Sequence, residues 1–408
     1  MEHLISELDV THLLGFPVDF NGNLRRASSE AVYTARQGVR VNFAVSTEGA
    51  RIAFREILTV RKTNDVKVIP LYPLLPRRVA PQISWRVNNL IALPLQALKF
   101  SMRNTILHVH APTPVFKPFS LSLVNKLSKR LMVLDIHDPW SGHPFPVLGL
   151  VEMQLRTELM RYAIKSADSV VVAHTALIKP VREINPRVPI NVIPNGVDVE
   201  LFRPQPRNVS IAKKLGVTDQ DIVIAFSGHI TDEKGLDVLV KSAATLVRSY
   251  RNIKFLIVGD GGFLKEIKTL VSNLKLEDKF IFVGFLSGDQ LPDYLSLADI
   301  CVAPYMPGPW YEVSKVETPL KVVEYMALGK PVVMSRISEE NVLTWGNGGL
   351  LVTPGDVSEL TSSLISLIED EKLRNSLGEN GRRFIEKEYS WQKITKKLIS
   401  IYRSLNEK

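Results

Sequence analysis

The fold of the second half of the chain is decided by residues 221–262, which read DIVIAFSGHITDEKGLDVLVKSAATLVRSYRNIKFLIVGDGG. A β-branched run at Ile222–Phe226 is followed by an amphipathic stretch at Leu236–Tyr250 and a second apolar run at Phe255–Val258. The two runs have the length and composition of buried strands, and the stretch between them has the period of a helix. Strand, helix and strand in this order predict a parallel sheet covered by helices.

The same alternation continues through the rest of the second half. It predicts one doubly wound, Rossmann-like domain over residues 201–390, with helices on both faces of a parallel sheet. The further predicted strands are Phe280–Val283, Ile300–Ala303, Pro331–Met334 and Gly349–Val352, and the further predicted helices are Phe263–Leu274, Gln290–Leu297, Leu320–Leu328 and Val357–Gly378.

The first half repeats the alternation less regularly and predicts a second Rossmann-like domain over residues 1–200. Residues 390–408 are expected to form a helix that packs back onto this domain. The stretch Val188–Pro204 contains the turn-forming Pro194-Asn195-Gly196 and is interpreted as the linker. The predicted strands are Val10–Leu14, Arg40–Val45, Ile106–His110, Met132–Ile136 and Ser169–Ala173.

The composition of the 408 residues, 45% hydrophobic and 23% charged, is that of a folded soluble protein. A single cysteine, Cys301, excludes an intrachain disulfide and favours the reducing cytoplasm. The chain has no apolar run of the roughly 18 residues that a spanning helix needs, and its N-terminus lacks the layout of a signal peptide. An integral membrane protein is therefore not expected.

The positive charge is concentrated in one segment. The net charge is +9, and residues 51–130 hold 14 Lys and Arg residues against two acidic residues, Glu56 and Asp65. Such a segment predicts an anionic partner. A non-catalytic nucleic-acid-binding protein is one alternative, but the basic residues are not interleaved with stacking aromatics and no known nucleic-acid module is present, so no nucleic acid is expected as a partner.

Part of the basic segment has a helical apolar stripe. Arg77-Arg78 precede residues 82–100, which contain Pro94. The pattern predicts either a peripheral contact with the anionic inner face of the cell membrane or an ordinary helix with its stripe in the core. The stripe consists of Ile83, Val87, Leu90, Ile91 and Leu98, while Arg86, Asn88, Asn89, Gln96 and Lys99 fall largely elsewhere.

Short polar and glycine-rich loops follow the predicted strands of the second half. Ser227-Gly228-His229 follows the first strand and Gly259-Asp260-Gly261-Gly262 the second. Two open sheets in one chain leave a cleft between them, and ligands of open sheets lie beyond the carboxyl ends of the strands. Glycine also allows the backbone to approach a ligand closely. These loops are therefore candidate ligand contacts.

A helix start provides a candidate anion site. Pro319 suits the first helical position, so the backbone amides of Leu320 and Lys321 are expected at the positive end of the helix, next to the Lys321 charge. Glu324 lies about one turn further on and can accept hydrogen bonds from sugar hydroxyls. The alternative is that Lys321 and Glu324, three residues apart, form a surface ion pair.

Taken together, these loops resemble those of the retaining, nucleotide-sugar-dependent glycosyltransferases of the GT-B fold, of the family 4 (glycosyl transferases group 1) type. The resemblance covers nearly the whole C-terminal half and extends to part of the first. Its carriers are Ser227-Gly228-His229, Glu233-Lys234-Gly235, Ile257–Gly261, Val283-Gly284-Phe285, Ala298-Asp299, Glu324–Val333 and Gly349–Asp356, together with Leu134–Trp140, Ser166-Ala167-Asp168 and Val192–Asp198 upstream.

The resemblance implies a role for particular residues. His137, in a His-Asp signature, would meet the donor sugar near the reacting carbon. Two positions depart from the family pattern: His229 stands where the family usually has an arginine, and Val316 stands where it has its first glutamate. The implied contacts are Lys234, His229, Leu320 and Lys321 with the donor diphosphate; Glu324, Gly259 and Phe285 with the nucleotide; Glu317, Thr318 and Pro319 with the donor sugar; and Asn21, Gly22 and Asn23 in an acceptor loop.

The implied reaction moves a hexose from a nucleotide diphosphate sugar to a carbohydrate or lipid-linked acceptor by front-side attack, with no protein nucleophile. No cofactor and no metal is expected, because the sequence contains no pair of histidines one helical turn apart. An alternative within the same fold is a sugar-nucleotide epimerase, which needs no acceptor.

Overall fold

The computed structural model describes residues 8–15, 22–46, 66–74, 87–93, 95–96, 106–111, 119–122, 125–126, 130–137, 149–286, 288–307, 319–337 and 341–407. The chain divides into two compact units, which we call the N-terminal unit (Met1–Asn195 with Trp391–Lys408) and the C-terminal unit (Gly196–Ser390).

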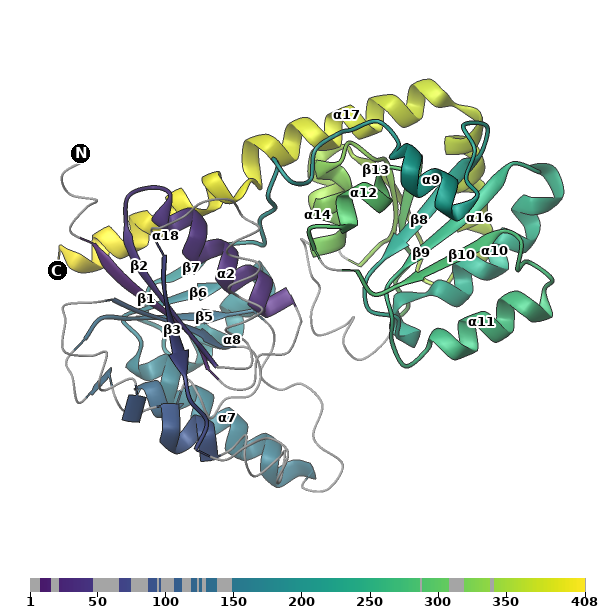
Figure 1. Ribbon diagram of the computed structural model, residues 1–408. Helices are drawn as coiled ribbons and strands as arrows, with labels where there is room; N and C mark the ends of the chain where they lie inside the picture. Colours follow the sequence, from purple (N-terminus) through teal and green to yellow (C-terminus); the bar gives the residue numbers. More distant parts are fainter. Residues whose placement is uncertain are drawn as a thin grey trace. The chain divides into compact units, whose positions relative to one another are not determined.

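The N-terminal unit is built on a parallel sheet with the strand order β3-β2-β1-β4-β5-β6-β7 (Figure 1). Its elements are β1 (Asp9–Gly15), α2 (Gly22–Ala35), β2 (Arg40–Ser46), β3 (Val66–Leu71), the π-helical turn η1 (Asn88–Ala92), β4 (Ile106–Ala111), β5 (Met132–Ile136), α7 (Gly149–Ser166), β6 (Ser169–Val172), the 3-10 turn η2 (Thr175–Leu177), α8 (Ile178–Ile184), β7 (Ile190–Val192) and α18 (Trp391–Asn406).

Each face of this sheet has its own apolar core. Val10, Phe43 and Ile106 pack with α2 and α18 on one face, and Leu107 and Leu134 pack with α7 and α8 on the other. Successive side chains of a strand point to opposite faces. Residues 12 on β1, 108 and 110 on β4 and 135 on β5 therefore share the face that α2 and α18 cover.

The C-terminal unit has a parallel sheet with the order β10-β9-β8-β11-β12-β13. One face packs against α12, α14 and α17, and the other against α10, α11 and α16. Its elements are α9 (Val209–Leu215), β8 (Ile222–Ser227), the 3-10 turn η3 (Asp232–Lys234), α10 (Leu236–Ser249), β9 (Ile253–Val258), α11 (Leu264–Asn273), β10 (Phe280–Gly284), α12 (Leu291–Leu295), β11 (Ile300–Ala303), α14 (Leu320–Ala327), β12 (Val332–Ser335), α15 (Val342–Gly346), β13 (Gly349–Val352), α16 (Val357–Glu369) and α17 (Glu371–Glu388).

The structure differs from the sequence prediction in several elements. The single helix predicted over 357–378 is wrong, because Asp370 has an extended backbone and its side chain accepts a hydrogen bond from Leu373 N, which starts α17 as a new helix. The predicted linker is partly wrong, because β7 pairs with β6 as the edge strand of the N-terminal sheet. The prediction also missed β3 and the short helix α9. Pro70 interrupts the strand pattern of β3 in the sequence, and the proline is tolerated because β3 is an edge strand.

Candidate functional site

The loops that follow β8 and β9 touch each other through glycines. Gly259 has φ of +138°, and a Cβ atom on it would lie 1.9 Å from the carbonyl oxygen of Gly228. The amide of Gly228 donates in turn to the carbonyl of Val258 at 2.9 Å. A side chain at position 259 would force the two loops apart, so this glycine is required by a close backbone approach at the carboxyl end of the sheet.

Lys321, at the start of α14, points an ammonium group under these loops. Its Nζ lies 3.8 Å from the centroid of the Phe226 ring and 3.0 Å from where a Cβ on Gly228 would stand. This Nζ is buried and has no hydrogen-bond partner among the residues that the structure describes. A buried cation without a partner is costly, and an anion at this position would satisfy it.

A second cation lies close to the first. The ring centroid of Tyr305 is 5.3 Å from Nζ of Lys234 and 5.6 Å from Nζ of Lys321. Burial lowers the pKa of Lys321 well below its usual value, the Lys234 charge lowers it further, and Glu324 opposes both. Burial also lowers the pKa of Lys234. Two desolvated ammonium groups on one aromatic ring favour a ligand with more than one negative charge.

The helix start adds backbone donors. Pro319 is the residue before α14 and not its first helical residue as predicted, and its carbonyl accepts from the amides of Val322 and Val323. The amides of Leu320 and Lys321 therefore have no preceding carbonyl within the helix. Glu324 is 5% exposed and so does not lie at the surface, which contradicts the alternative of a surface ion pair with Lys321.

The other residues predicted for the donor side lie around this point or outside the described residues. His229 is exposed directly after Gly228, and Phe285 follows β10 with 64% of its side chain exposed. Glu317 and Thr318 are outside the described residues.

Three aromatic residues of this region were missed by the sequence reasoning. Phe226 and Tyr305 contact the lysines as described, and the Tyr325 hydroxyl accepts from Ser227 N at 2.6 Å. Phe226 ends a strand, Tyr305 follows one, and Tyr325 lies on α14. The positions of Phe226 and Tyr305, near the carboxyl ends of predicted strands, could have identified these two residues from sequence. Tyr325 has no such signal.

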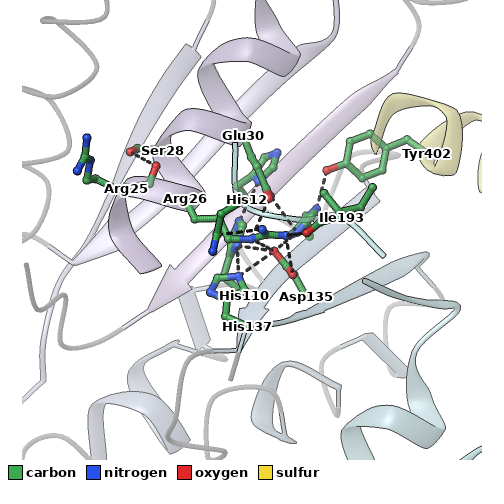
Figure 2. Close-up of polar contacts among 12 residues, drawn as sticks. His12, Arg25, Arg26, Ser28, Glu30, His110, Asp135, His137, Ile193 and Tyr402 are labelled. Carbon is green, nitrogen blue, oxygen red and sulfur yellow. Dashed lines mark hydrogen bonds and ion pairs between the residues drawn. The ribbon is translucent and has the colours of Figure 1, made fainter. Parts of the chain in front are cut away.

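In the N-terminal unit, His137 follows β5 and is 6% exposed. Its Nε2 lies 2.8 Å from Oδ2 of Asp135, which is fully buried (Figure 2). Arg26 of α2 reaches the same carboxylate, with Nε 3.2 Å from Oδ2 and Nη2 3.4 Å from Oδ1. The histidine of the predicted His-Asp signature is thus connected to a buried ion pair.

Three more histidines surround Asp135. His12 of β1 stacks on His108 of β4, and His108 stacks on His110, with ring centroids 4.6 and 4.5 Å apart. Taken singly in the sequence, His108 and His110 are each interpreted as structural residues. The spacing of these residues could have predicted the cluster. His108 and His110 are two apart, as are Asp135 and His137, and residues two apart on a strand share one face of the sheet.

Burial and the Arg26 charge set the ionisation of this cluster. Burial alone would raise the pKa of Asp135, but the Arg26 charge and hydrogen bonds from the histidines hold it well below its usual range. Burial raises the pKa of Glu30, one turn after Arg26, to about 8. Burial also lowers the pKa values of His12, His108 and His110. At neutral pH the cluster therefore combines the Arg26 guanidinium and the Asp135 carboxylate with neutral rings at His12, His108 and His110.

Two groups of these side chains bring potential metal ligands within 4.8 Å of one another. The first group is His12, Glu30, His108 and His110, and the second is His110, Asp135 and His137. A metal ion lies in the plane of the imidazole that binds it, and the nearly parallel rings of His12, His108 and His110 cannot all meet that condition for one ion. In the second group the shared Asp135 oxygen is 3.2 Å from Nε of Arg26, whose charge opposes a cation. The arrangement fits a hydrogen-bonded cluster better than a metal site.

The predicted acceptor loop lies at the start of α2. Gly22 is the first residue of this helix and Asn23 the second, whereas Asn21 is outside the described residues. Among the remaining histidines, His174 is buried after β6 and His143 lies outside the described residues.

Two families have sequence models that match the chain. The model of Glycosyltransferase Family 4 matches residues 25–201, and that of Glycosyl transferases group 1 matches residues 209–384. Together they cover most of both units.

Relatives with known names match over part of their length. The chain is 28% identical over 200 residues to alpha-D-kanosaminyltransferase of Streptomyces kanamyceticus, covering 49% of this chain and 50% of the relative. It is 31% identical over 215 residues to the GDP-mannose-dependent monoacylated alpha-(1-6)-phosphatidylinositol monomannoside mannosyltransferase of Corynebacterium glutamicum, covering 52% and 55%. The matched part of the chain thus spans about half the length of these curated relatives.

Among solved structures, Anabaena Alr3699/HepE in complex with UDP matches 97% of this chain and 100% of its own, with a TM-score of 0.72 at 18% identity. A sucrose-phosphate synthase from Thermosynechococcus elongatus matches 99% and 97%, with a TM-score of 0.69 at 20% identity. These similarities establish the two-domain GT-B fold. With a family 4 match in its first half and a group 1 match in its second, the chain belongs to the GT-B glycosyltransferases.

Proposed function

We propose that this chain transfers a hexose from a nucleotide diphosphate sugar to a carbohydrate or lipid-linked acceptor, with retention of anomeric configuration and without a metal ion or other cofactor. The observation that carries the proposal is the buried Nζ of Lys321, which lacks a hydrogen-bond partner among the described residues and lies next to the Lys234 charge. A diphosphate supplies the negative charge that this arrangement lacks.

The proposed chemistry is the one that the family resemblance implies. The bond between the anomeric carbon and the donor phosphate oxygen breaks while the acceptor oxygen bonds to the same face of that carbon. The acceptor proton passes to a phosphate oxygen, and the negative charge of the leaving diphosphate is stabilised by Lys234, Lys321 and the first amides of α14. His137 would contact the donor sugar, and Phe285, Gly259 and Glu324 the nucleotide.

Turnover of candidate donors tests this proposal. The full chain is incubated with UDP-, GDP- and ADP-hexoses in EDTA, with and without glycan and lipid-linked acceptor fractions, and the released nucleotide and the product are analysed by NMR. We expect acceptor-dependent release of nucleoside diphosphate and a product with the anomeric configuration of the donor. An epimerised nucleotide sugar formed without acceptor would favour the epimerase alternative, and an inverted product would contradict retention.

His229 offers a second test, because it replaces the arginine that usually helps to hold the diphosphate. We expect His229→Arg to bind nucleoside diphosphate roughly threefold more tightly or better, since a guanidinium supplies a permanent charge and can bind a phosphate through two parallel N–H donors. The dissociation constant of nucleoside diphosphate, measured by calorimetry for the wild type and the variant, tests this expectation. Abolished binding would show that position 229 does not face the diphosphate. Lys254→Arg, on β9 with its Nζ bonded to the Asp278 carbonyl, is the control that should leave affinity unchanged.

We also propose that the chain is cytoplasmic and that its N-terminal unit binds an anionic membrane surface peripherally. No helix within the described ranges is long and apolar enough to span a bilayer. The segment after β3 is joined to the region of η1 by hydrogen bonds, including Leu74 N to Asn88 Oδ1 at 2.8 Å. Asn88, expected on a polar face, is buried by this contact. The two segments carry four exposed apolar side chains, Tyr72, Leu74, Ile91 and Leu95.

Liposome sedimentation tests this membrane proposal. We expect the chain to pellet with anionic vesicles at low salt, and less at high salt, because basic residues contribute about 1 kcal/mol each near such a surface. Leu74→Glu/Ile91→Glu should abolish pelleting, as should Arg77→Glu/Arg78→Glu, whose positions lie outside the described residues. Val209→Glu, at an even more exposed apolar position of the C-terminal unit, is the control. Equal recovery in the supernatant with neutral and anionic vesicles would contradict the proposal.

A further inference from the structure

His137 shares a short hydrogen bond with Asp135, two residues before it. The atoms Nε2 and Oδ2 are 2.8 Å apart, and both side chains are buried. The bond lies inside the N-terminal unit, on the sheet face covered by α2 and α18. Which of the two groups holds the proton determines what His137 can offer to a ligand.

Asp135 is held in its ionised form by Arg26. The guanidinium donates to both carboxylate oxygens, and it is itself fixed by hydrogen bonds to the Ile193 carbonyl at 2.8 Å and to Asn195 Oδ1 at 3.3 Å. An ionised carboxylate only accepts hydrogen bonds. The partner atom of His137, its Nε2, must therefore carry a proton.

The neighbouring rings are consistent with the same assignment. His110 Nδ1 lies 3.3 Å from Asp135 Oδ2 and donates to it, so His110 Nε2 accepts from His12 Nδ1 at 3.0 Å. His108 Nε2 is 3.5 Å from the same oxygen, and its Nδ1 then accepts from the Tyr402 hydroxyl at 2.5 Å. One proton on each of these rings satisfies the contacts just described. His110 Nδ1 and His137 Nε2, which lie 3.4 Å apart, then both donate to Asp135 and not to each other (Figure 2).

We infer that Asp135 and Arg26 are positioning residues which hold a proton on Nε2 of His137. The inference rests on the proposed function in one respect, that His137 contacts the donor sugar. The Nε2 proton is then committed to Asp135 and is not available to the sugar. The Asp135 contact also fixes the orientation of the ring.

The tautomer can be observed directly in the resting protein. The full chain is labelled with ¹⁵N-histidine, of which it contains eight residues, and the His137 ring signals are identified by their absence in His137→Gln. We expect a protonated Nε2 at neutral pH. A protonated Nδ1 with a bare Nε2 would overturn the inference. This measurement needs no substrate, so it remains decisive if the proposed transfer reaction is not found.

The variant Asp135→Asn tests the consequence for turnover. Its amide presents either an oxygen or an NH₂ group to Nε2, and it no longer holds one tautomer. Glu30 Oε1, 3.0 Å from Arg26 Nε, can ionise to compensate the guanidinium. We expect kcat to fall about 10²-fold or more while KM for the nucleotide sugar stays within about threefold, because a mispositioned ring affects the reacting centre.

Three further variants separate positioning from simple structural support. Arg26→Lys keeps the charge and is expected to restore part of the turnover that Arg26→Gln loses. Asp168→Asn is the matched control, since Asp168 accepts from Met132 N at 2.7 Å at the opposite end of β5 and does not contact His137. Equal losses of kcat in Asp135→Asn and Asp168→Asn, with an unchanged His137 tautomer in both, would contradict the inference.

Discussion

Replacing Lys321 with methionine is expected to weaken the binding of nucleoside diphosphate by about 10- to 100-fold, because hydrogen bonds to charged groups contribute about 1.5–3 kcal/mol. Turnover should fall by about 10²- to 10³-fold, as expected when a preorganised charge at a leaving group is lost. The methionine keeps an apolar stem over the Phe226 ring. Affinity is measured by calorimetry and turnover by nucleotide release.

The same variant should unfold less readily than the wild type in the absence of ligand. Burial lowers the pKa of Lys321, so the unfolded chain binds this proton more tightly than the folded one. The charged form therefore costs stability below the folded pKa, and the cost declines as the pH rises toward about 10.4, the value for an unperturbed lysine. The gain in free energy of unfolding in Lys321→Met is expected to be largest at low pH and to shrink as the pH rises.

Lys330→Met is the matched control for both effects. Burial lowers the pKa of Lys330 as well, but its Nζ donates to the Ala298 carbonyl at 2.6 Å and to that of Ser296 at 3.2 Å. Its removal leaves these acceptors without their donor and should destabilise the fold by about 1–3 kcal/mol, with nucleotide affinity unchanged. A loss of affinity in Lys330→Met but not in Lys321→Met would contradict the assignment of the diphosphate site.

His137→Ala is expected to lower kcat by about 10²- to 10³-fold and to leave the affinity for nucleoside diphosphate within about threefold, because the ring acts at the sugar. Turnover with a saturating donor and calorimetric titration with the diphosphate separate the two quantities. His174→Ala removes a buried histidine that follows the neighbouring strand β6. That control should keep wild-type kcat even if the fold is weakened, and a silent His137→Ala would place the sugar elsewhere.

The strand positions of both sheets could be predicted from sequence, because parallel strands buried on both faces are short continuous apolar runs such as Phe255–Val258. The exceptions are edge strands: β3 carries Pro70, and β7 consists of three half-buried residues. Asp370 was missed because the apolar periodicity continues through it, although its capping side chain starts a new helix.

The candidate site was predictable only in part. Lys234, Lys321 and His137 could be selected because they follow motifs in the sequence. The contact of Lys321 with Phe226, and the convergence of Arg26, His108 and His110 on Asp135, depend on pairing between strands and helices far apart in the chain. Such contacts have no local signal beyond the alternation of residues along each strand.

The central claim is that the C-terminal unit holds a nucleoside diphosphate through Lys321 and the start of α14. Calorimetric titration of the full chain with UDP, GDP and ADP in EDTA tests it most directly. We expect at least one of the three to bind with 1:1 stoichiometry without a divalent ion, and to raise the free energy of unfolding by about 2.7 kcal/mol at 100 times its dissociation constant. If none of them binds, or if binding is the same in Lys321→Met, the claim is contradicted.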